Sequence, residues 1–472
     1  MGAVDVDALR QRGVDRQAPI AKVPDSSISE QVWSSGVVFY PPSKTYWRIG
    51  GEWYDFREFL NTHPGGAQVL QLARDRFEDC TFVFEAHHHN YQRARAMIRK
   101  YKVSRDVVRE TWQKRPEKDD IGAEKAHFDS NLEQLEYPSL LGKTSFYSIL
   151  RRRVTDYLMK VGHPDGGPTL ECKILFWTIF VAWAVLWWGT WASGSLGVSV
   201  LWGLISAWLG AFGHNWVHQP YYKKWGWALL SLDTVGFSSE AWYREHVLQH
   251  HMYTNTPWDN HFRGTDPFLK TDPTVPRSFL QGWVMPYINP LVLCFGVYGN
   301  YIVHTAQLLQ GNEVWSIGKL ILPLQFASMI TRWGWLYGVA LMFACHGFIG
   351  VYYFTLALMN HNAEHCHDVS SRNKSVDFGH AQLNSSADWA VNLGFLPAMV
   401  YLWLNYHTVH HLFPRIDMSH HRGIQRILME TCREHDIKYS TSDFMTIYCE
   451  MVNSFATPHS LFKEIFVHAG GI

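Results

Sequence analysis

The stretch KILFWTIFVAWAVLWWGTWA, residues 173–192, is an apolar run long enough to cross a membrane as one helix. A second run, SLGVSVLWGLISAWLGAFG, follows at residues 195–213, and only Ser193 and Gly194 separate the two. Each is close to the ~20 residues that a membrane-spanning helix needs. The pair therefore predicts a helical hairpin in a lipid bilayer.

Two more spans are expected further along the chain. An apolar block covers residues 317–360 and is interrupted near Arg332. It is too long for one crossing, so it predicts spans at about 317–335 and 338–360. Residues 284–303 are also apolar, but Pro286, Pro290 and several glycines interrupt them. We expect this last stretch to be interfacial or re-entrant.

The charges around the first hairpin predict its orientation. The basic run at residues 151–153 and Lys160 precede the first span, and Lys223 and Lys224 follow the second. The connecting turn carries no charge. Because basic residues are retained on the cytoplasmic side, both outer ends should lie in the cytoplasm and the turn in the lumen.

Composition also indicates a chain that lies partly in a membrane. Only 18% of the 472 residues are charged, 15% are aromatic and 22 are Trp, and Trp gathers at membrane–water interfaces. The mean hydropathy is nevertheless −0.16, so much of the chain must lie in water. Lys and Arg number 42, as do Asp and Glu, so no net charge attracts nucleic acid. The composition excludes both a fully soluble globule and a bare bundle of spans.

The order of segments predicts two folded units. Residues 1–30 are a polar tail, residues 31–106 mix short strand-like and helical stretches, and residues 107–170 are a charged connector. The spans belong to a membrane domain over residues 171–460. The seven cysteines are scattered without a CxxC pair, which argues against a disulfide framework or a zinc ribbon.

A histidine-bearing turn lies in the first unit. The string YWRIGGEWYDFREFLNTHPGG occupies residues 46–66 and places His63 at a tight Pro-Gly-Gly turn. Its imidazole can ligate a metal, and the turn brings the backbone close to it. About two dozen residues later, DCTFVFEAHHHN at residues 79–90 presents three consecutive histidines.

Together these two strings resemble the cytochrome b5 domain. The resemblance implies a small α+β domain that holds haem b between two axial histidines, the first of which is His63. In domains fused to desaturases the second ligand lies four residues after a Phe, here Phe84, which selects His88. The spacing in free cytochrome b5 selects His89 instead. Two histidine ligands leave no open position on the iron, so the haem would carry electrons rather than bind oxygen.

Three histidine boxes lie at the ends of membrane segments: HNWVH at residues 214–218, REHVLQHH at 244–251 and NYHTVHHLFP at 405–414. Residues three or four apart share one face of a helix, so the boxes together could hold two metal ions. No Glu follows the first His of the first two boxes, since Asn215 and Val247 are there, which disfavours the zinc motif HExxH. The eight histidines are His214, His218, His246, His250, His251, His407, His410 and His411.

The number of spans provides an independent check on this grouping. If the first unit lies in the cytoplasm, two spans return the chain there for the first two boxes. Two more spans return it again for the third box. An odd number would separate the boxes, which disfavours residues 284–303 as a lone crossing.

The boxes resemble those of the membrane fatty-acid desaturases, H-x(3,4)-H, H-x(2,3)-HH and [HQ]-x(2)-HH. The strings HMYTNTPWDNHFRGTDPF at 251–268 and NYHTVHHLFPRI at 405–416 resemble front-end acyl desaturases, which carry an N-terminal cytochrome b5 domain. The resemblance covers residues 31–106 and about 171–440. It implies a further ligand in MNHNAEHCH, residues 359–367, where His361 matches best and His365 is the alternative. Front-end enzymes usually have Gln where this chain has His407, and methyl-end desaturases have His there, so the regioselectivity stays open.

The resemblance implies two non-haem iron ions held by the eight box histidines and His361. Electrons would come from NADH-cytochrome b5 reductase through the haem. Dioxygen would serve to remove two hydrogens from neighbouring carbons of a long-chain, polyunsaturated substrate carried as a lipid or acyl-CoA. Side-chain acid–base chemistry cannot break an unactivated C–H bond, so a metal–oxygen oxidant is needed. Imidazole suits iron, zinc and copper alike, so the ligand type alone does not select the metal.

The expected fold is therefore a small α+β cytochrome b5-like domain followed by an all-α integral membrane domain of about four transmembrane helices. A histidine-rich cap would face the cytosol, and the membrane would be that of the endoplasmic reticulum. The sequence is also compatible with a sphingoid-base desaturase and with a haem-fused di-iron lipid hydroxylase, which would place oxygen on carbon. A membrane haem carrier with inactive metal boxes is the third alternative.

Overall fold

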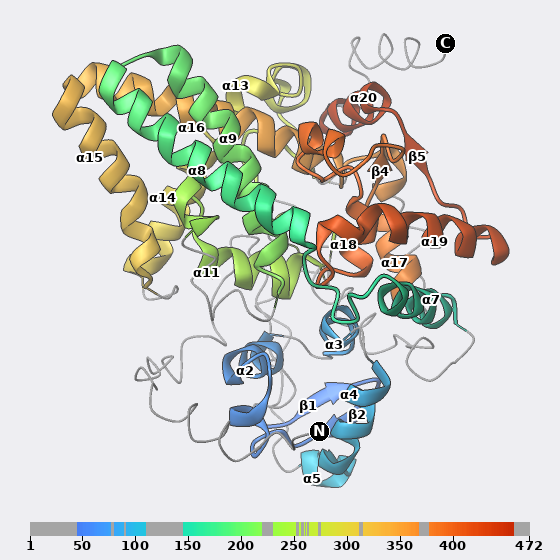
Figure 1. Ribbon diagram of the computed structural model, residues 1–472. Coiled ribbons are helices and arrows are strands. Elements are labelled where there is room, and N and C mark those ends of the chain that lie inside the picture. The colour runs from blue at the N-terminus through green and yellow to red at the C-terminus, as the bar shows by residue number, and fades with distance from the viewer. Residues whose placement is uncertain are drawn as a thin grey trace.

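The computed structural model describes residues 45–76, 80–88, 91–109, 145–219, 230–251, 254, 255, 259, 261, 264–271, 275–310, 315–367 and 377–456. In Figure 1 a small N-terminal unit, coloured blue, lies beneath a larger helical body coloured green to red. This arrangement confirms the expected fold class, a small α+β domain followed by a largely helical domain. The tail at 1–30, most of the connector, Lys223, Lys224 and the alternative haem ligand His89 lie outside the described residues.

The small domain is built on a three-stranded antiparallel sheet in the order β1 (Trp47–Ile49), β2 (Glu52–Tyr54), β3 (Lys102–Val103). Gly50 and Gly51, both with positive φ, form the tight turn between β1 and β2. Trp47, Phe56 and Phe59 are buried in its core. The helices are η1 (Leu60–Thr62), α2 (Ala67–Arg76), α3 (Thr81–His87), α4 (Tyr91–Ile98), η2 (Arg99–Tyr101) and α5 (Arg105–Arg109).

The first apolar hairpin consists of α8 (Leu170–Ser193) and α9 (Leu196–Trp216), which pack against each other. The Thr169 and Ser195 side chains cap the two helices by accepting bonds from the backbone N–H groups of Cys172 and Val198. Gly194 ends α8 in the left-handed conformation at φ 64°, which glycine adopts without steric cost. Both helices are long and apolar enough to cross a membrane.

The second hairpin consists of α15 (Ile321–Trp333) and α16 (Trp335–Met359), joined at Gly334 with φ 77°. Among the described helices, α16 is the third with the length and apolarity to span a membrane. The 13-residue α15 rises only about 20 Å, less than the ~30 Å hydrocarbon core, because a 3₁₀ turn, η9 (Ile317–Leu320), precedes it. The stretch expected as the third span is therefore a shorter helix.

The two hairpin turns lie at the same end of the bundle. The Trp333 indole donates to the carbonyl of Trp191 at 2.8 Å, and the Tyr337 hydroxyl donates to the carbonyl of Gly194 at 2.7 Å. The other ends of α9 and α16, which carry His214 and lead to His361, consequently point the same way.

Residues 284–303 do not form one straight helix. After η8 (Leu280–Val284) the chain forms α13 (Asn289–Leu293) and α14 (Gly296–Leu309), and both pack against α16. The Tyr298 hydroxyl donates to the carbonyl of Met342 at 3.1 Å. This stretch is thus broken near Cys294 and is supported by the spanning helix beside it.

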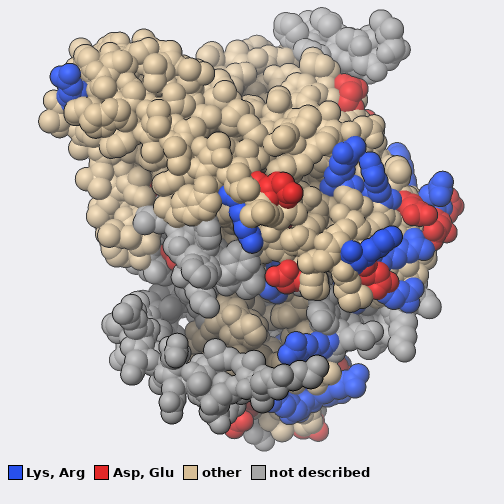
Figure 2. Space-filling model, viewed as in Figure 1, with Lys and Arg blue, Asp and Glu red and all other residues tan. Residues whose placement is uncertain are grey.

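A cap of short elements covers the ends of the bundle that carry histidines. Asp388 and Trp389 of its β4 pair in parallel with β5. Figure 2 shows charged side chains gathered over α7, α19 and the small domain, whereas the helical surface at the upper left is almost free of them. The elements are α7 (Phe146–Lys160), η5 (Asp233–Val235), α11 (Ser239–Trp242), η6 (Tyr243–His250), η10 (Glu364–His367), α17 (Phe378–Ser385), β4 (Asp388–Trp389), η12 (Pro397–Tyr401), α18 (His407–Leu412), η13 (Met418–His420), α19 (His421–Glu434), β5 (Thr441–Ser442) and α20 (Phe444–Phe455).

Close packing between α9 and α16 depends on Gly203. A Cβ atom at this position would lie 2.6 Å from the carbonyl oxygen of Cys345, which is backbone and cannot move aside. The Ser199 hydroxyl one turn earlier donates to the carbonyl of Leu341. We expect Gly203→Ala to lower the thermal unfolding midpoint of the detergent-solubilised protein, because overpacking costs about 1–3 kcal/mol.

Gly299→Ala on α14 is the matched control, since a Cβ there meets no atom within 4 Å. Without a clash, the better helix propensity of Ala should leave stability unchanged or slightly higher. Equal midpoints for the two variants would contradict the close approach of α9 and α16.

Candidate metal centre and haem site

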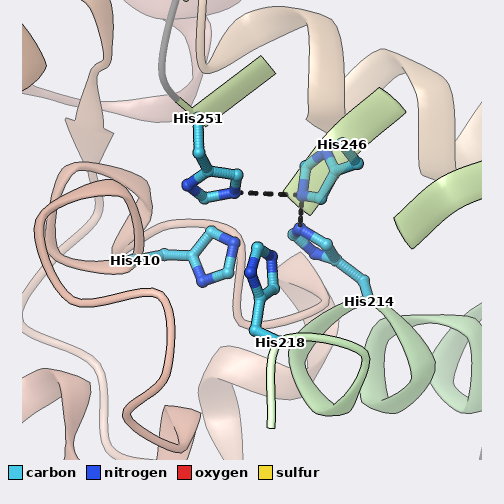
Figure 3. A group of neighbouring side chains, drawn as sticks. All are labelled: His214, His218, His246, His251 and His410. Atoms are coloured by element: carbon cyan, nitrogen blue, oxygen red, sulfur yellow. Dashed lines mark hydrogen bonds between the residues drawn. The ribbon is translucent and has the colours of Figure 1, made fainter. Parts of the chain in front are cut away.

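The structure brings all nine histidines expected as metal ligands together at the cap. They form two groups, in each of which one ring nitrogen per residue lies within 4.8 Å of the others. The rings of the first group face one another around a common space (Figure 3). The first group is His214, His218, His246, His251 and His410, and the second is His250, His361, His407 and His411.

Four parts of the chain deliver these rings. The last turn of α9 carries His214, and His218 follows directly after that helix. The segment η6 and its C-terminal neighbour carry the second box, α18 carries the third, and His361 comes two residues after α16. The first box and His361 are therefore fixed to the ends of α9 and α16, whereas the second and third boxes lie on short helices of the cap.

The second box does not follow α-helical spacing. The segment η6 is a π-helix, whose backbone hydrogen bonds join residues five apart, so that residues five apart also lie near one face. His246 and His251 consequently belong to the same group, and His250 turns toward the second group. The His246 and His250 rings still stack, with centroids 5.0 Å apart, as their four-residue spacing predicts, while His251 joins His246 in the first group.

The second group contains two ring nitrogens that face each other without a hydrogen between them. His250 donates through Nδ1 to the buried Asp259 carboxylate at 2.9 Å, and His361 donates through Nδ1 to the carbonyl of Ser385 at 2.9 Å. In a neutral imidazole the other nitrogen is then an acceptor. These two Nε2 atoms are only 3.1 Å apart, so two lone pairs repel unless a cation lies between them.

In the first group, several buried ring nitrogens lack a hydrogen-bond partner among the described residues. His214 and His251 place their Nε2 atoms 2.7 and 3.1 Å from Nε2 of His246 (Figure 3). Both ring nitrogens of His218, and Nε2 of His410, are buried without a hydrogen-bond partner among the described residues. Buried polar atoms are normally paired, so these nitrogens fit a site that binds metal ions through neutral imidazole.

Burial keeps these imidazoles neutral. Burial lowers the pKa of His218, His246 and His251 well below its ordinary value. Repulsion from neighbouring imidazoles is the second cause of this shift. The same causes act on His407 and His411. A neutral ring offers the lone pair that a metal needs.

A layer of polar residues that the sequence reasoning missed orients the ligands. The side-chain oxygen of Gln382 lies 3.0 Å from Nδ1 of His411. The Asp388 carboxylate accepts from the backbone N–H of Thr408 at 2.6 Å, at the N-terminus of α18, where negative charge is favourable. Burial raises the pKa of Asp259 and Asp388 to about 6. The only sequence signal for Asp259 was its place in the motif after box two.

Two further histidines near the boxes have different positions. His261 lies close enough to His246 and His250 to form a third potential metal-binding group with them. His365, the alternative to His361, instead places Nε2 3.0 Å from the carbonyl of Ser386 and belongs to none of the groups.

The small domain places His63 and His88 opposite each other, with ring centroids 6.1 Å apart and the ring planes tilted by 60°. This separation suits one metal ion between two ring nitrogens, each at roughly 2 Å. Nδ1 of each ring faces a backbone carbonyl, that of Gly66 for His63 and that of Phe84 for His88, which leaves both Nε2 atoms for an iron. A Cβ on Gly65 would lie 2.9 Å from the His63 ring, which explains the small residue beside it.

The two sites approach each other at one contact between the domains. The Arg415 guanidinium, four residues after His411, donates to the carbonyl oxygen of His87. His87 is half-buried, and its buried Nε2 atom has no hydrogen-bond partner among the described residues. His87 is the neighbour of His88 and is close enough to act electrostatically on His218.

Comparison with known proteins points to one family. The model of the fatty acid desaturase family matches residues 189–443, more than half of the chain, and that of the cytochrome b5-like haem/steroid-binding domain matches residues 38–107. The chain is 22% identical to a probable Delta(5) fatty acid desaturase C of Dictyostelium discoideum, over 83% of this chain and 86% of that one. It is 24% identical to an acyl-lipid (8-3)-desaturase of Mortierella alpina (84% and 89%) and 25% to one of Physcomitrium patens (93% and 92%).

The contact between Asp259 and His250 generates a prediction about metal binding. Asp259→Ala removes the acceptor that fixes the His250 ring, and loss of such a partner typically costs 10–100-fold in metal affinity. We therefore expect less non-haem metal per chain in the purified variant, measured by elemental analysis after subtraction of haem iron. Asp259→Asn, which keeps an acceptor oxygen, should retain more metal than the Ala variant.

Asp156→Ala, at an exposed position on α7, is the control and should retain the wild-type metal content. Unchanged haem content in every variant would exclude general misfolding. A full complement of metal in the Asp259→Ala protein would contradict the orienting role.

Proposed function

This chain belongs to the fatty acid desaturase family as a front-end type with a fused cytochrome b5 domain, and we propose that it introduces a double bond into a long-chain acyl substrate with dioxygen as the oxidant. The observation that carries this proposal is the pair of inward-facing histidine groups. Under the proposal each group holds one non-haem iron ion. Nine neutral nitrogen donors in two adjacent groups suit a two-metal site.

The ligand residues would perform three tasks in this reaction. The Nε2 atoms of His250 and His361 hold metal because their Nδ1 atoms are already engaged. Asp259 and Gln382 keep the rings in one orientation. Burial of the groups excludes bulk water. When bound, the two irons would supply the oxygen activation that side chains cannot provide.

The fused haem domain would supply the electrons. His63 and His88 fit a six-coordinate haem, whose chemistry is electron transfer. The contact from Arg415 to His87 supports a direct route, since it joins the chain beside a haem ligand to the loop that follows box three. A cytochrome b5 reductase using NADH is the proposed source of these electrons.

We further propose that haem domain and cap lie on the cytosolic side of the endoplasmic reticulum membrane. The uncharged turn between α8 and α9 and the charged cap support this orientation, whereas one charge, Arg332, lies beside the turn between α15 and α16. The relatives named as Delta(5) fatty acid and acyl-lipid (8-3) desaturases support a fatty acyl substrate, which we propose to be polyunsaturated.

Expression in yeast fed with candidate fatty acids tests the function. We expect a new double bond toward the carboxyl end, identified by gas chromatography and mass spectrometry. His407→Ala should reduce the product to background because Nε2 of His407 lies 2.9 Å from that of His361 within the second group. His407→Gln should keep part of the activity, since related front-end enzymes have Gln there.

The same experiment separates the other functions. A hydroxylated product would identify a hydroxylase, and a desaturated long-chain base would identify a sphingoid-base desaturase. A reducible haem with no oxygen consumption on any lipid would contradict desaturation altogether. Near-normal product from His407→Ala would show that this ring is not a ligand.

The domain contact generates a separate prediction about electron transfer. In the full-length protein, Arg415→Ala should leave the haem spectrum and the reduction of haem by reductase unchanged. Reoxidation of the haem in the presence of substrate and dioxygen should slow, because the variant loses a contact that holds the haem domain beside the cap. Stopped-flow absorbance of the haem measures both steps.

Arg152→Ala, at an exposed position on α7, is the matched control for loss of one positive charge. His63→Ala, which removes a proposed axial ligand, provides the haem-free reference for the absorbance measurement. Equal reoxidation rates for the Arg415→Ala and wild-type proteins would contradict the route through this contact.

A further inference from the structure

A cavity lies on the cap, outside the histidine groups. Its volume is about 280 Å³, and it opens beside α19. Two guanidinium groups, Arg422 and Arg426, line one wall. The remaining lining residues are Val391, Asn392, Gln425, Met429, Tyr439 and Thr441.

The charge of this cavity favours an anion. Arg422 and Arg426 are one helical turn apart, and both are exposed. No Asp or Glu belongs to the lining, and neither arginine forms an ion pair with a carboxylate within the described part of the chain. Two guanidinium groups on one face, with amide and hydroxyl groups beside them, match the oxygens of a phosphate group.

Hydrogen bonds connect the cavity to the third histidine box. The Tyr439 hydroxyl donates to Asp388, the residue that accepts from the backbone N–H of Thr408 beside His407. On the adjacent wall, the Tyr406 hydroxyl donates to the carbonyl of Val391. The cavity therefore lies one layer of residues behind the ligands on α18.

The cavity also borders a surface suited to lipid. Directly after Asn392, the segment at residues 395–403 exposes Leu396 (63%) and Val400 (59%). The Trp403 ring contacts Phe212 of α9, and the Tyr352 hydroxyl of α16 donates to the carbonyl of Val400. An exposed apolar segment that is held at the ends of two spanning helices is expected to lie at the membrane interface.

We propose that this cavity binds the phosphate-bearing head group of the lipid substrate through Arg422 and Arg426. This inference rests on the proposed desaturase function and names the part of the substrate that the site recognises. A front-end enzyme acts near the carboxyl end of the acyl chain, so the head group must lie close to the metal centre. Phospholipids and acyl-CoA both carry the required phosphate. In a phospholipid it belongs to the head group, and in acyl-CoA it belongs to the coenzyme A moiety.

Binding to the purified full-length protein tests the proposal without turnover. The probes are lysophosphatidylcholine, coenzyme A and, as a phosphate-free analogue, monoacylglycerol with the same chain. The variants are Arg422→Gln with Arg426→Gln, and Arg433→Gln as the control at an exposed position on the same helix outside the cavity. We expect the wild type and the control to bind one phosphate-bearing probe about tenfold more tightly than monoacylglycerol, and the double variant to lose this difference.

Which phosphate probe shows the preference identifies the carrier as phospholipid or acyl-CoA. In yeast microsomes the double variant should raise KM for that carrier and leave kcat near that of the wild type. Absence of a preference in the wild type, or its full retention in the double variant, would overturn the proposal. Absence of product from a wild type that shows the binding preference would instead overturn the desaturase function and leave the phosphate site standing.

Discussion

Buried imidazole nitrogens that face one another repel, and the residues and helices around them must hold the rings against this repulsion. Nine neutral rings are packed at the cap, and in the pair His250 and His361 both facing nitrogens are acceptors. Such an arrangement is unfavourable in a dry interior unless cations occupy it. Three of these rings are held from behind by hydrogen bonds: Asp259 engages His250, the carbonyl of Ser385 engages His361, and Gln382 engages His411.

The membrane helices provide the rigidity that this arrangement requires. Both hairpin turns lie at one end of the bundle, so α9 and α16 present their opposite ends to the cap together. Gly203 allows the two helices to approach at backbone distance, which fixes His214 relative to His361. Burial of apolar surface between helices thus sets the geometry of a polar site that lies outside their apolar region.

Much of this organisation was predictable, because histidine spacing and apolar length are local properties. The nine rings that the structure gathers were all identified from box patterns and from the resemblance. The orienting residues were not, since Gln382 and Asp388 come from segments whose proximity to the boxes arises only on folding. The length of α15 was overestimated because hydropathy does not reveal that the stretch begins with a 3₁₀ turn, η9. The arginine-lined cavity arises from α19, residues 391–392 and residues 439–441 together, which no single stretch reveals.

The π-helical form of η6 links the winding of a helix to the length of a motif. In this chain three residues separate His246 from His250, and the first and last histidines of the box share a group because π-winding aligns residues five apart. With only two residues between them, the first and last histidines would be four apart, which an ordinary α-helix aligns. The two spacer lengths in the desaturase pattern, H-x(2,3)-HH, can therefore deliver the same pair of rings through two kinds of helix. At this box the three-residue spacer and the π-helical winding occur together, and together they place His246 and His251 in one group.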